Sequence, residues 1–236
     1  MVQGFAFSLM AVVWGLTWLP VKIAALHVPP IFLAACRFLL AGICFLVWCR
    51  VAGLSLRSKQ PLRLVAASLL ITTGCYGFLF WGVAHAPSGL SAIVNLALMP
   101  VFTILIGALY REEAITGRRL AAIALGIVGL LALFWTRAAG PRDGALVLVG
   151  LACVIAGTLS YAWGAIISRP LVREMPPVAL AFWQTFLGGL ALVPVSLAVE
   201  GFDPGHISGL LLPGPLLSLL FLVLAGSLTG LSLIHI

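Results

Sequence analysis

Two tryptophans and a lysine recur at every fourth position near the start of the chain. Trp14, Trp18 and Lys22 would share one face of a helix, with Thr17 beside them. Such a face could line a cavity in which the ammonium group of Lys22 attracts a carboxylate or phosphate and the indole rings contact an apolar body. The same pattern also fits an aromatic belt with a lysine side chain that snorkels to the membrane interface. Both interpretations stay open at the level of sequence.

A second candidate face surrounds Asn95. Ser88, Ser91, Asn95 and Met99 follow one another at spacings of three and four, as one side of a helix requires. An amide within hydrocarbon needs hydrogen-bond partners, so Asn95 either bonds a neighbouring helix or faces a cavity and binds a polar group of a ligand. Pro100 follows, and because proline lacks a backbone donor we expect a kink and an exposed carbonyl there.

Aromatic residues mark two further apolar runs. Tyr76 shares a helix face with Thr72 and Phe80, and in the second half of the chain Tyr161 and Trp163 flank a stripe of small residues. We expect Tyr76, Tyr161 and Trp163 to line the same cavity. Small residues at this spacing also allow close helix packing, so a purely structural role for these faces is the alternative.

A repeat places two more polar residues inside apolar sequence. Residues 28–42 read VPPIFLAACRFLLAG, residues 175–189 read MPPVALAFWQTFLGG, and each copy follows a Trp-Gly pair. Arg37 and Gln184 occupy the same position of the two copies. Polar side chains at such depth are costly and are mostly functional, so both are candidate binding residues. For Arg37 the alternative is structural, since it would hold carbonyl groups of a neighbouring helix or snorkel outward.

The composition indicates the class of protein that must position these residues. Hydrophobic residues make up 63% of the 236 and charged residues only 8%, whereas a soluble domain carries about 25% charged residues. The sequence therefore predicts an all-α polytopic membrane protein. The formal net charge of +7 arises in short loops between apolar runs, which gives no indication of nucleic acid binding. The five cysteines lie within apolar runs without CxxC or Cys/His spacing, so no disulfide framework, metal site or cofactor is expected.

Eight apolar runs are long enough to cross a bilayer as helices. We expect these spans at 4–25, 31–49, 62–84, 88–109, 119–135, 144–167, 178–198 and 211–230. The loops after the second, fourth and sixth runs hold most of the basic residues, which by the positive-inside rule puts the N-terminus in the cytoplasm. An odd number of spans separates the two copies of the repeat, so they enter the membrane from opposite sides. Inverted repeats around a central site are an architecture of alternating-access transporters.

Two other classes of function account for less of the sequence. A membrane enzyme would need a nucleotide-binding loop, a metal-ligand cluster or a Ser/His/Asp set, and none is recognisable. A non-transporting membrane partner or scaffold subunit would have the same hydropathy, but it gives no reason for the inverted repeat or for polar faces inside the spans. The sequence thus favours a transporter with a small-molecule substrate, and it leaves a homodimer open.

Short motifs run through residues 4–230 in a definite order. They are Trp14-Gly15-Leu16-Thr17-Trp18 with Lys22, Pro29-Pro30, Arg37-Phe38, Pro100-Val101-Phe102, Glu113 with Ile115-Thr116, and Gly126 with Gly129. This series resembles the drug/metabolite transporter superfamily, EamA type. The resemblance implies ten helices in two inverted five-helix repeats, and about eight helices are present here. Residues 1–139 would form the first repeat and residues 140–230 an incomplete second repeat of three helices.

The same resemblance implies a function and a location. Members of the family export small metabolites such as amino acids or nucleobases, so we expect a multi-pass protein of the inner membrane that works by alternating access between its repeats. The final residues, 231–236, read LSLIHI and resemble the translation of a sequencing adapter. We therefore expect a non-native tail there.

Overall fold

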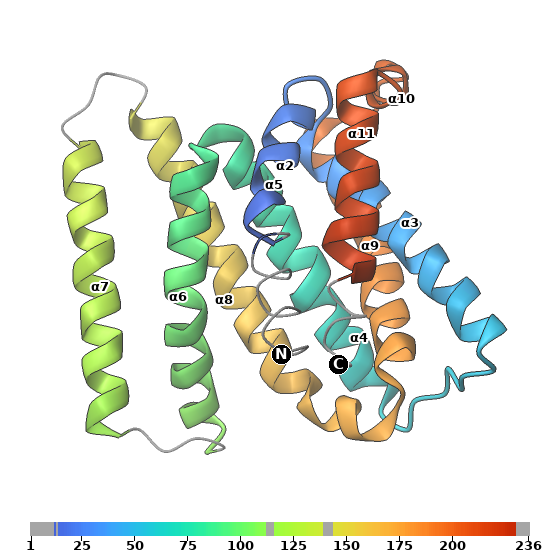
Figure 1. Cartoon of the computed structure of the whole chain (residues 1–236), viewed down its shortest axis with the longest axis horizontal. Coiled ribbons are helices and arrows are strands. Elements are labelled where there is room, and N and C mark those ends of the chain that lie inside the picture. Colours follow the sequence, from blue (N-terminus) through green and yellow to red (C-terminus); the bar gives the residue numbers. More distant parts are fainter. Residues whose placement is uncertain (1–11, 13, 112–115, 139–143, 230–236) are drawn as a thin grey trace.

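Long uncharged runs fold as helices because backbone N–H and C=O groups in hydrocarbon must bond one another. The computed structural model describes residues 12, 14–111, 116–138 and 144–229, and these residues form helices and no strand (Figure 1). The elements are α2 (Trp18–Ala24), α3 (Pro30–Val51), α4 (Pro61–Ser68), η1 (Leu69–Gly74), α5 (Cys75–His85), α6 (Ser88–Leu109), α7 (Gly117–Ala138), α8 (Gly144–Glu174), α9 (Pro177–Glu200), α10 (Gly205–Leu210), α11 (Pro213–Phe221) and η2 (Leu222–Thr229). The expected all-α architecture is confirmed.

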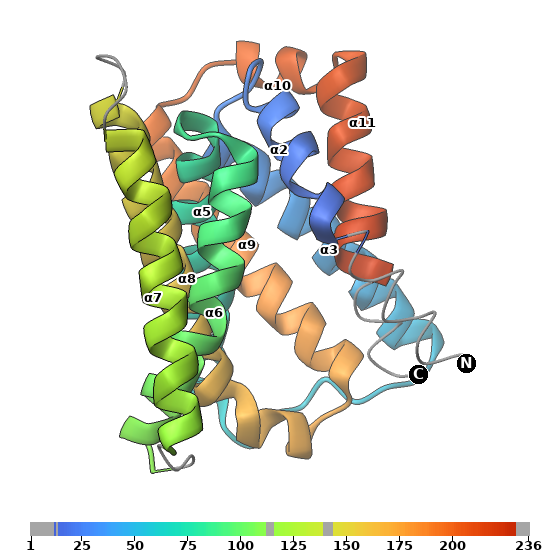
Figure 2. The ribbon, with the colours of Figure 1, turned by 60° about the vertical axis from the view of Figure 1, so that its left-hand side comes forward.

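Several helices have the length and apolar character of membrane spans. Within the described residues there are five of them: Pro30–Val51, Pro61–His85, Ser88–Leu109, Gly144–Glu174 and Pro177–Glu200. Each covers one of the predicted spans. α7 covers the predicted span 119–135 at one edge of the bundle beside α6 (Figures 1 and 2), and α11 with η2 covers most of 211–230. The chain is therefore an all-α polytopic membrane protein.

Two predicted span boundaries differ from the ends of the helices. α8 continues past residue 167 to Glu174, because the chain stays helical through Pro170 and fully buries Leu171. The run predicted to begin at residue 211 becomes a long helix only at Pro213, where proline supplies the first helical residue. The short helix α10 ends just before it, at Leu210.

The two copies of the repeated segment begin with the same geometry. Pro29 precedes α3 with φ −57° and ψ 136°, and Pro176 precedes α9 with φ −57° and ψ 137°. Pro30 and Pro177 are the first helical residues, a position where proline loses no hydrogen bond and its fixed φ favours the helix. The Pro-Pro pairs therefore start the same helix twice.

The repeated helices also pack on each other reciprocally. A Cβ built on Gly42 of α3 would lie 3.0 Å from the Cβ of Phe186 on α9, and one built on Gly189 of α9 would lie 3.0 Å from the backbone nitrogen of Leu39 on α3. Gly42 and Gly189 are equivalent in the two copies, as are Leu39 and Phe186. Such an exchange of equivalent contacts is what a twofold axis produces. The contact between α3 and α9 therefore has the reciprocal geometry of an approximate twofold axis.

Two of the helices contain π-helical segments. η1 lies between α4 and α5, and η2 continues α11. π-turns leave backbone groups to be bonded by neighbouring helices. At η1 the hydroxyl of Ser160 on α8 donates to the carbonyl of Leu70 at 2.8 Å, and the hydroxyl of Thr73 donates to the carbonyl of Gly188 on α9 at 2.9 Å. η1 is thus bonded to both α8 and α9.

The packed interior lies where α3, α5, α8 and α9 meet. Phe45 on α3, Phe80 on α5 and Leu192 on α9 are fully buried there. Large apolar side chains also cover the outside of the helices, for example Val51 and Leu62. An apolar outer surface is what a bilayer solvates. The interior of the bundle is therefore where polar side chains need a functional or structural explanation.

Candidate functional site

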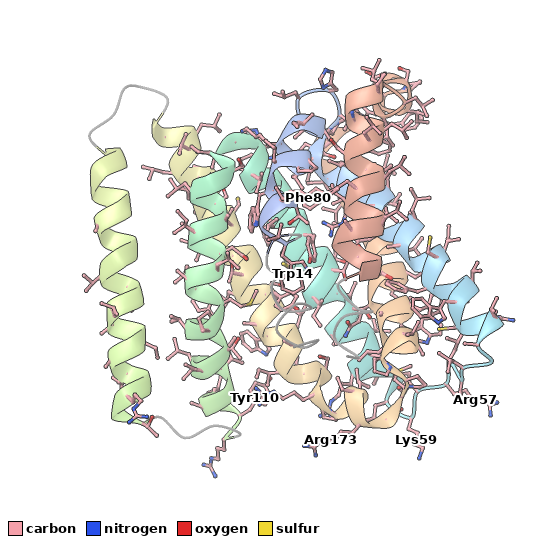
Figure 3. All side chains as sticks on the ribbon, viewed as in Figure 1. Trp14, Arg57, Lys59, Phe80, Tyr110 and Arg173 are labelled. Atoms are coloured by element: carbon pink, nitrogen blue, oxygen red, sulfur yellow. The ribbon has the colours of Figure 1, made fainter. Side chains whose placement is uncertain are left out.

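A cavity of about 350 Å³ lies within the bundle. Seven of the predicted site residues line it: Trp14, Thr17, Trp18, Arg37, Tyr76, Asn95 and Tyr161. They come from the segment before α2, from α2 itself, and from α3, α5, α6 and α8, while η2 adds Gly226. Figure 3 shows Trp14 and Phe80, which also lines the cavity, in the middle of the bundle. Cavities of this size hold small organic molecules.

Arg37 is the cation of this cavity. Its side chain is only 5% exposed, and its guanidinium carbon lies 4.9 Å from the ring centre of Phe38, 5.4 Å from that of Tyr76 and 5.7 Å from that of Phe80. These distances are those of cation–π interactions. Its Nε atom has no hydrogen-bond partner in the described part of the chain. The rings thus hold the guanidinium in place without neutralising it.

A glycine keeps space open beside this guanidinium. A Cβ built on Gly226 of η2 would lie 2.9 Å from one terminal nitrogen of Arg37 and 3.3 Å from the methyl carbon of Thr17. A larger residue would therefore press on the arginine from the cavity side. Gly226 could not be predicted from the sequence, because a lone glycine in an apolar run does not indicate what it faces.

Asn95 joins two helices and also faces the cavity. Its amide nitrogen donates to the hydroxyl oxygen of Thr158 on α8 at 2.8 Å, and that hydroxyl donates to the carbonyl of Val154 at 2.7 Å. Because the hydroxyl proton of Thr158 is already used, its oxygen must accept from Asn95, and this fixes the orientation of the amide. The carbonyl oxygen of Asn95 is then the atom that can accept from a ligand. Asn95 thus bonds a neighbouring helix and also lines the cavity, and its binding of a ligand stays a prediction.

Aromatic rings and small residues form the remaining walls. Trp14 and Trp18 approach from the N-terminal segment, where the hydroxyl of Thr17 donates to the carbonyl of Trp14 at 2.6 Å in a turn before α2. Tyr76 lies 4.4 Å from Phe38 between ring centres. Phe80 and Met99 also line the cavity, and the sequence pattern had placed them on the same helix faces as Tyr76 and Asn95. Other lining residues were not foreseen because they are small or aliphatic: Gly15, Val21, Cys75, Leu79 and Leu96.

Three predicted site residues lie outside the lining. The ammonium group of Lys22 donates to the carbonyls of Val83, Ala84 and Ala86 at 3.1, 2.6 and 3.2 Å, at the C-terminal end of α5. A lysine there offsets the negative end of the helix dipole. Trp163 is 39% exposed on the outer surface and donates to the hydroxyl of Tyr110 at 3.0 Å. Gln184 lies on α9, and its side chain is not part of the cavity.

A carboxylate at the end of α9 holds the first turn of α3. One oxygen of Glu200 accepts from the backbone nitrogen of Ile31 at 2.7 Å, and the other accepts from that of Phe32 at 2.8 Å. The hydroxyl of Ser196 donates to the same carboxylate at 2.8 Å. Free N–H groups at a helix start are satisfied well by an anion. Glu200 thus ties the second half of the chain to the first.

A second carboxylate does the same at the other end of α9. Glu174, the last residue of α8, accepts from the hydroxyl of Ser58 at 3.0 Å, from the side-chain amide of Gln60 at 3.0 Å and from the backbone nitrogen of Lys59. These partners belong to the connection between α3 and α4. Glu174 and Glu200 therefore link the two halves at opposite ends of the bundle.

The side chains that line the cavity are suited to binding a small molecule. Among the described residues, no three or more of His, Cys, Asp and Glu cluster in a way that could hold a metal ion. The lining combines one cation, one amide and several rings with aliphatic side chains. Such a set holds and orients a small molecule by charge, hydrogen bonding and apolar contact.

Comparisons with known proteins give a family and relatives. A model described as the EamA-like transporter family matches residues 4–135. A protein of Salmonella typhimurium named probable amino-acid metabolite efflux pump is 32% identical over 97% of this chain and 75% of its own length. The protein with the same name in Escherichia coli is 31% identical over 84% of this chain. The uncharacterized inner membrane transporter YedA of Escherichia coli is 27% identical over 97% of this chain and 71% of its own length.

The chain is shorter than its relatives but has the fold of a solved structure. The chain spans 65% of the Escherichia coli efflux pump. One solved crystal structure matches 99% of this chain and 78% of its own chain with a TM-score of 0.66 at 19% identity. At that identity the likeness concerns the fold alone.

Proposed function

The chain belongs to the EamA-like transporter family, and we propose that it exports an amino acid, a nucleobase or a related small metabolite by alternating access. Family and relatives identify a membrane transporter of a metabolite, embedded in a lipid bilayer. Our proposal adds to this the substrate class, the outward direction of transport and the alternating-access mechanism.

The cavity around Arg37 and Asn95 is the observation that carries this proposal. It lies inside the bundle, and it combines a buried cation, an oriented amide and rings from several helices. Buried polar groups within a membrane protein mark the path of a polar solute, because without one they would be left in hydrocarbon at a cost. We therefore assign substrate binding to Trp14, Thr17, Trp18, Arg37, Tyr76, Asn95 and Tyr161.

The contact between the halves supports alternating access. The reciprocal glycine packing of α3 and α9 gives the halves a twofold pivot, and Glu174 and Glu200 link them at its two ends. Release of one carboxylate link while the other holds would open the bundle on one side only. Inverted halves that rock about a central site provide alternating access in this way. We take residues 1–139 and 140–230 as those halves, and the family model covers most of the first.

Charge distribution supports an orientation in the membrane. Figure 3 shows Arg57, Lys59 and Arg173 at the same end of the bundle, although they come from different parts of the chain. By the positive-inside rule this end faces the cytoplasm. We therefore propose that the N-terminus is cytoplasmic. We also propose the inner membrane as the location, which is the membrane in the name of the relative YedA.

An export assay tests the proposed function. Cells that express the full chain would be fed dipeptides, which raise intracellular amino acids, and the medium would be analysed by mass spectrometry. We expect at least one metabolite to accumulate outside faster than in cells with Asn95→Ala, while Trp163→Phe, which changes a side chain outside the cavity, exports like the wild type. Export would be refuted if the media of all strains contained the same metabolite concentrations while the strains held equal amounts of the protein in their membranes.

A further inference from the structure

We propose that the cavity selects metabolites with net negative charge, namely carboxylates whose amino group is absent or acylated, over zwitterionic amino acids. This inference rests on the proposed function in that it concerns the same cavity. It goes further because it predicts the charge of the preferred substrate, which the names of the relatives leave open.

The charge balance of the lining is the first argument. Among the described residues of the lining, Arg37 is the one cation and there is no carboxylate. The acids that the structure describes are bonded elsewhere: Glu200 to the first turn of α3, Glu174 to residues 58–60, and Asp203 to the backbone nitrogen of Gly205 at 2.7 Å. The described part of the cavity therefore carries one uncompensated positive charge. Only an anionic ligand neutralises it.

The state of the guanidinium is the second argument. Arg37 is almost completely buried, and its Nε lacks a hydrogen-bond partner in the described chain. A buried charge without a counter-ion is strongly unfavourable, whereas a carboxylate can accept two parallel hydrogen bonds from an arginine. One terminal nitrogen lies against Gly226, where a Cβ would be 2.9 Å away, and the guanidinium lines the cavity. A ligand carboxylate would thus satisfy groups that the protein leaves unsatisfied.

The surroundings of Arg37 also disfavour a second cation. An ammonium group in the cavity would need a carboxylate or a free ring face. The rings nearest to Arg37, those of Phe38, Tyr76 and Phe80, already contact the guanidinium, so an amino group held next to a bound carboxylate finds no free face among them. The amide oxygen of Asn95 provides one neutral acceptor, which suits the N–H of an acylated amine at least as well as an ammonium ion. A free amino group therefore brings repulsion from Arg37 without a compensating anion.

A series of ligands with one ring and three charges tests the proposal. At about pH 6, below the pKa of an α-amino group and above that of a carboxyl group, N-acetyl-phenylalanine is an anion, phenylalanine is a zwitterion and phenylalaninamide is a cation. Binding of each to the full chain in detergent would be measured by titration calorimetry. We expect the wild type to bind N-acetyl-phenylalanine about tenfold or more tightly than phenylalanine, and phenylalaninamide most weakly.

Two variants connect the preference to one side chain. Arg37→Gln should weaken N-acetyl-phenylalanine binding about tenfold and abolish the preference for it over phenylalanine. Arg50→Gln, which removes an exposed arginine from the same helix, should leave the preference unchanged. The wild-type ligand series decides the question even where Arg37→Gln fails to fold. Equal or tighter binding of phenylalanine by the wild type would overturn the inference, as would an Arg37→Gln variant that folds and keeps the preference.

The same experiment separates this inference from the proposed function. Counterflow of the three ligands would be measured in parallel in proteoliposomes. Selective binding of N-acetyl-phenylalanine without movement of any solute would contradict carriage and leave the charge selection standing. Counterflow of phenylalanine as fast as that of N-acetyl-phenylalanine would support carriage and overturn the charge selection.

Discussion

Gly226 lies directly against the guanidinium of Arg37, and a Cβ in its place would be 2.9 Å from a terminal nitrogen. This relationship joins the end of the described chain to the first repeated helix, across the cavity. Arg37 is the only cation among the described residues of the lining, and the room available to it depends on the lack of a side chain at position 226.

Replacement of this glycine should impair binding more than folding. Gly226→Ala would push the flexible end of Arg37 away from the cavity, so we expect ligand affinity to fall about fivefold to tenfold with little change in melting temperature. Calorimetry and thermal unfolding in detergent measure the two effects. Gly89→Ala is the matched control, since a Cβ there meets nothing within 4 Å. Unchanged affinity of Gly226→Ala would exclude Gly226 from the site.

The contact between the repeated helices should respond equally from either side. In Gly42→Ala and in Gly189→Ala the new methyl group would meet the backbone of the opposite helix at close to 3 Å. We expect each substitution to lower the free energy of unfolding by about 1–3 kcal/mol, because two helix backbones must separate. Gly129→Ala on α7, where a Cβ has open space, is the control. A large effect of one glycine and none of the other would argue against the twofold contact.

Lys22 should stabilise the fold without affecting the ligand. Lys22→Met removes the donor to three carbonyls at the end of α5, and we expect a loss of about 1–2 kcal/mol in unfolding free energy. Ligand affinity should stay the same, because Lys22 is not part of the cavity lining. Lower affinity at an unchanged melting temperature would instead support the substrate-binding interpretation that the sequence allowed.

The orientation in the membrane can be measured by cysteine labelling. In a variant with the five native cysteines replaced, Ser208→Cys should react with a membrane-impermeant maleimide added to spheroplasts, and Arg57→Cys should react only after the membrane is opened. Residue 57 lies at the end of the bundle that carries the basic residues (Figure 3). The reversed pattern would place the N-terminus outside the cell.

Periodicity predicted the fold well and the site in part. Hydrophobic run length located the helices, and the i, i+4 spacing grouped Trp14 with Trp18, which both line the cavity. The spacing of residues along one helix does not reveal which neighbouring helix has unpaired carbonyl groups that a side chain can bond. Lys22 therefore shares a sequence pattern with the tryptophans but bonds to the end of α5.

The repeat predicted equivalent positions, but equivalence does not bring side chains to one site. Arg37 faces the cavity, whereas Gln184, at the same position of the second copy, lies outside its lining. The position equivalent to Arg37 in the second copy lies in another part of the bundle. Gln184 therefore has other neighbours than Arg37, and only Arg37 meets this cavity. Gly226 gave no sequence signal at all, since its role depends on what packs against it.

Accessibility of the cavity from both sides of the membrane is the most direct test of this account. A single cysteine in place of Met99, which lines the cavity, would be labelled with an impermeant maleimide in right-side-out and in inside-out vesicles. Alternating access predicts labelling in both preparations, while Ser208→Cys and Arg57→Cys each label in one only. Labelling of the Met99 position from one side alone would contradict a carrier with a central site.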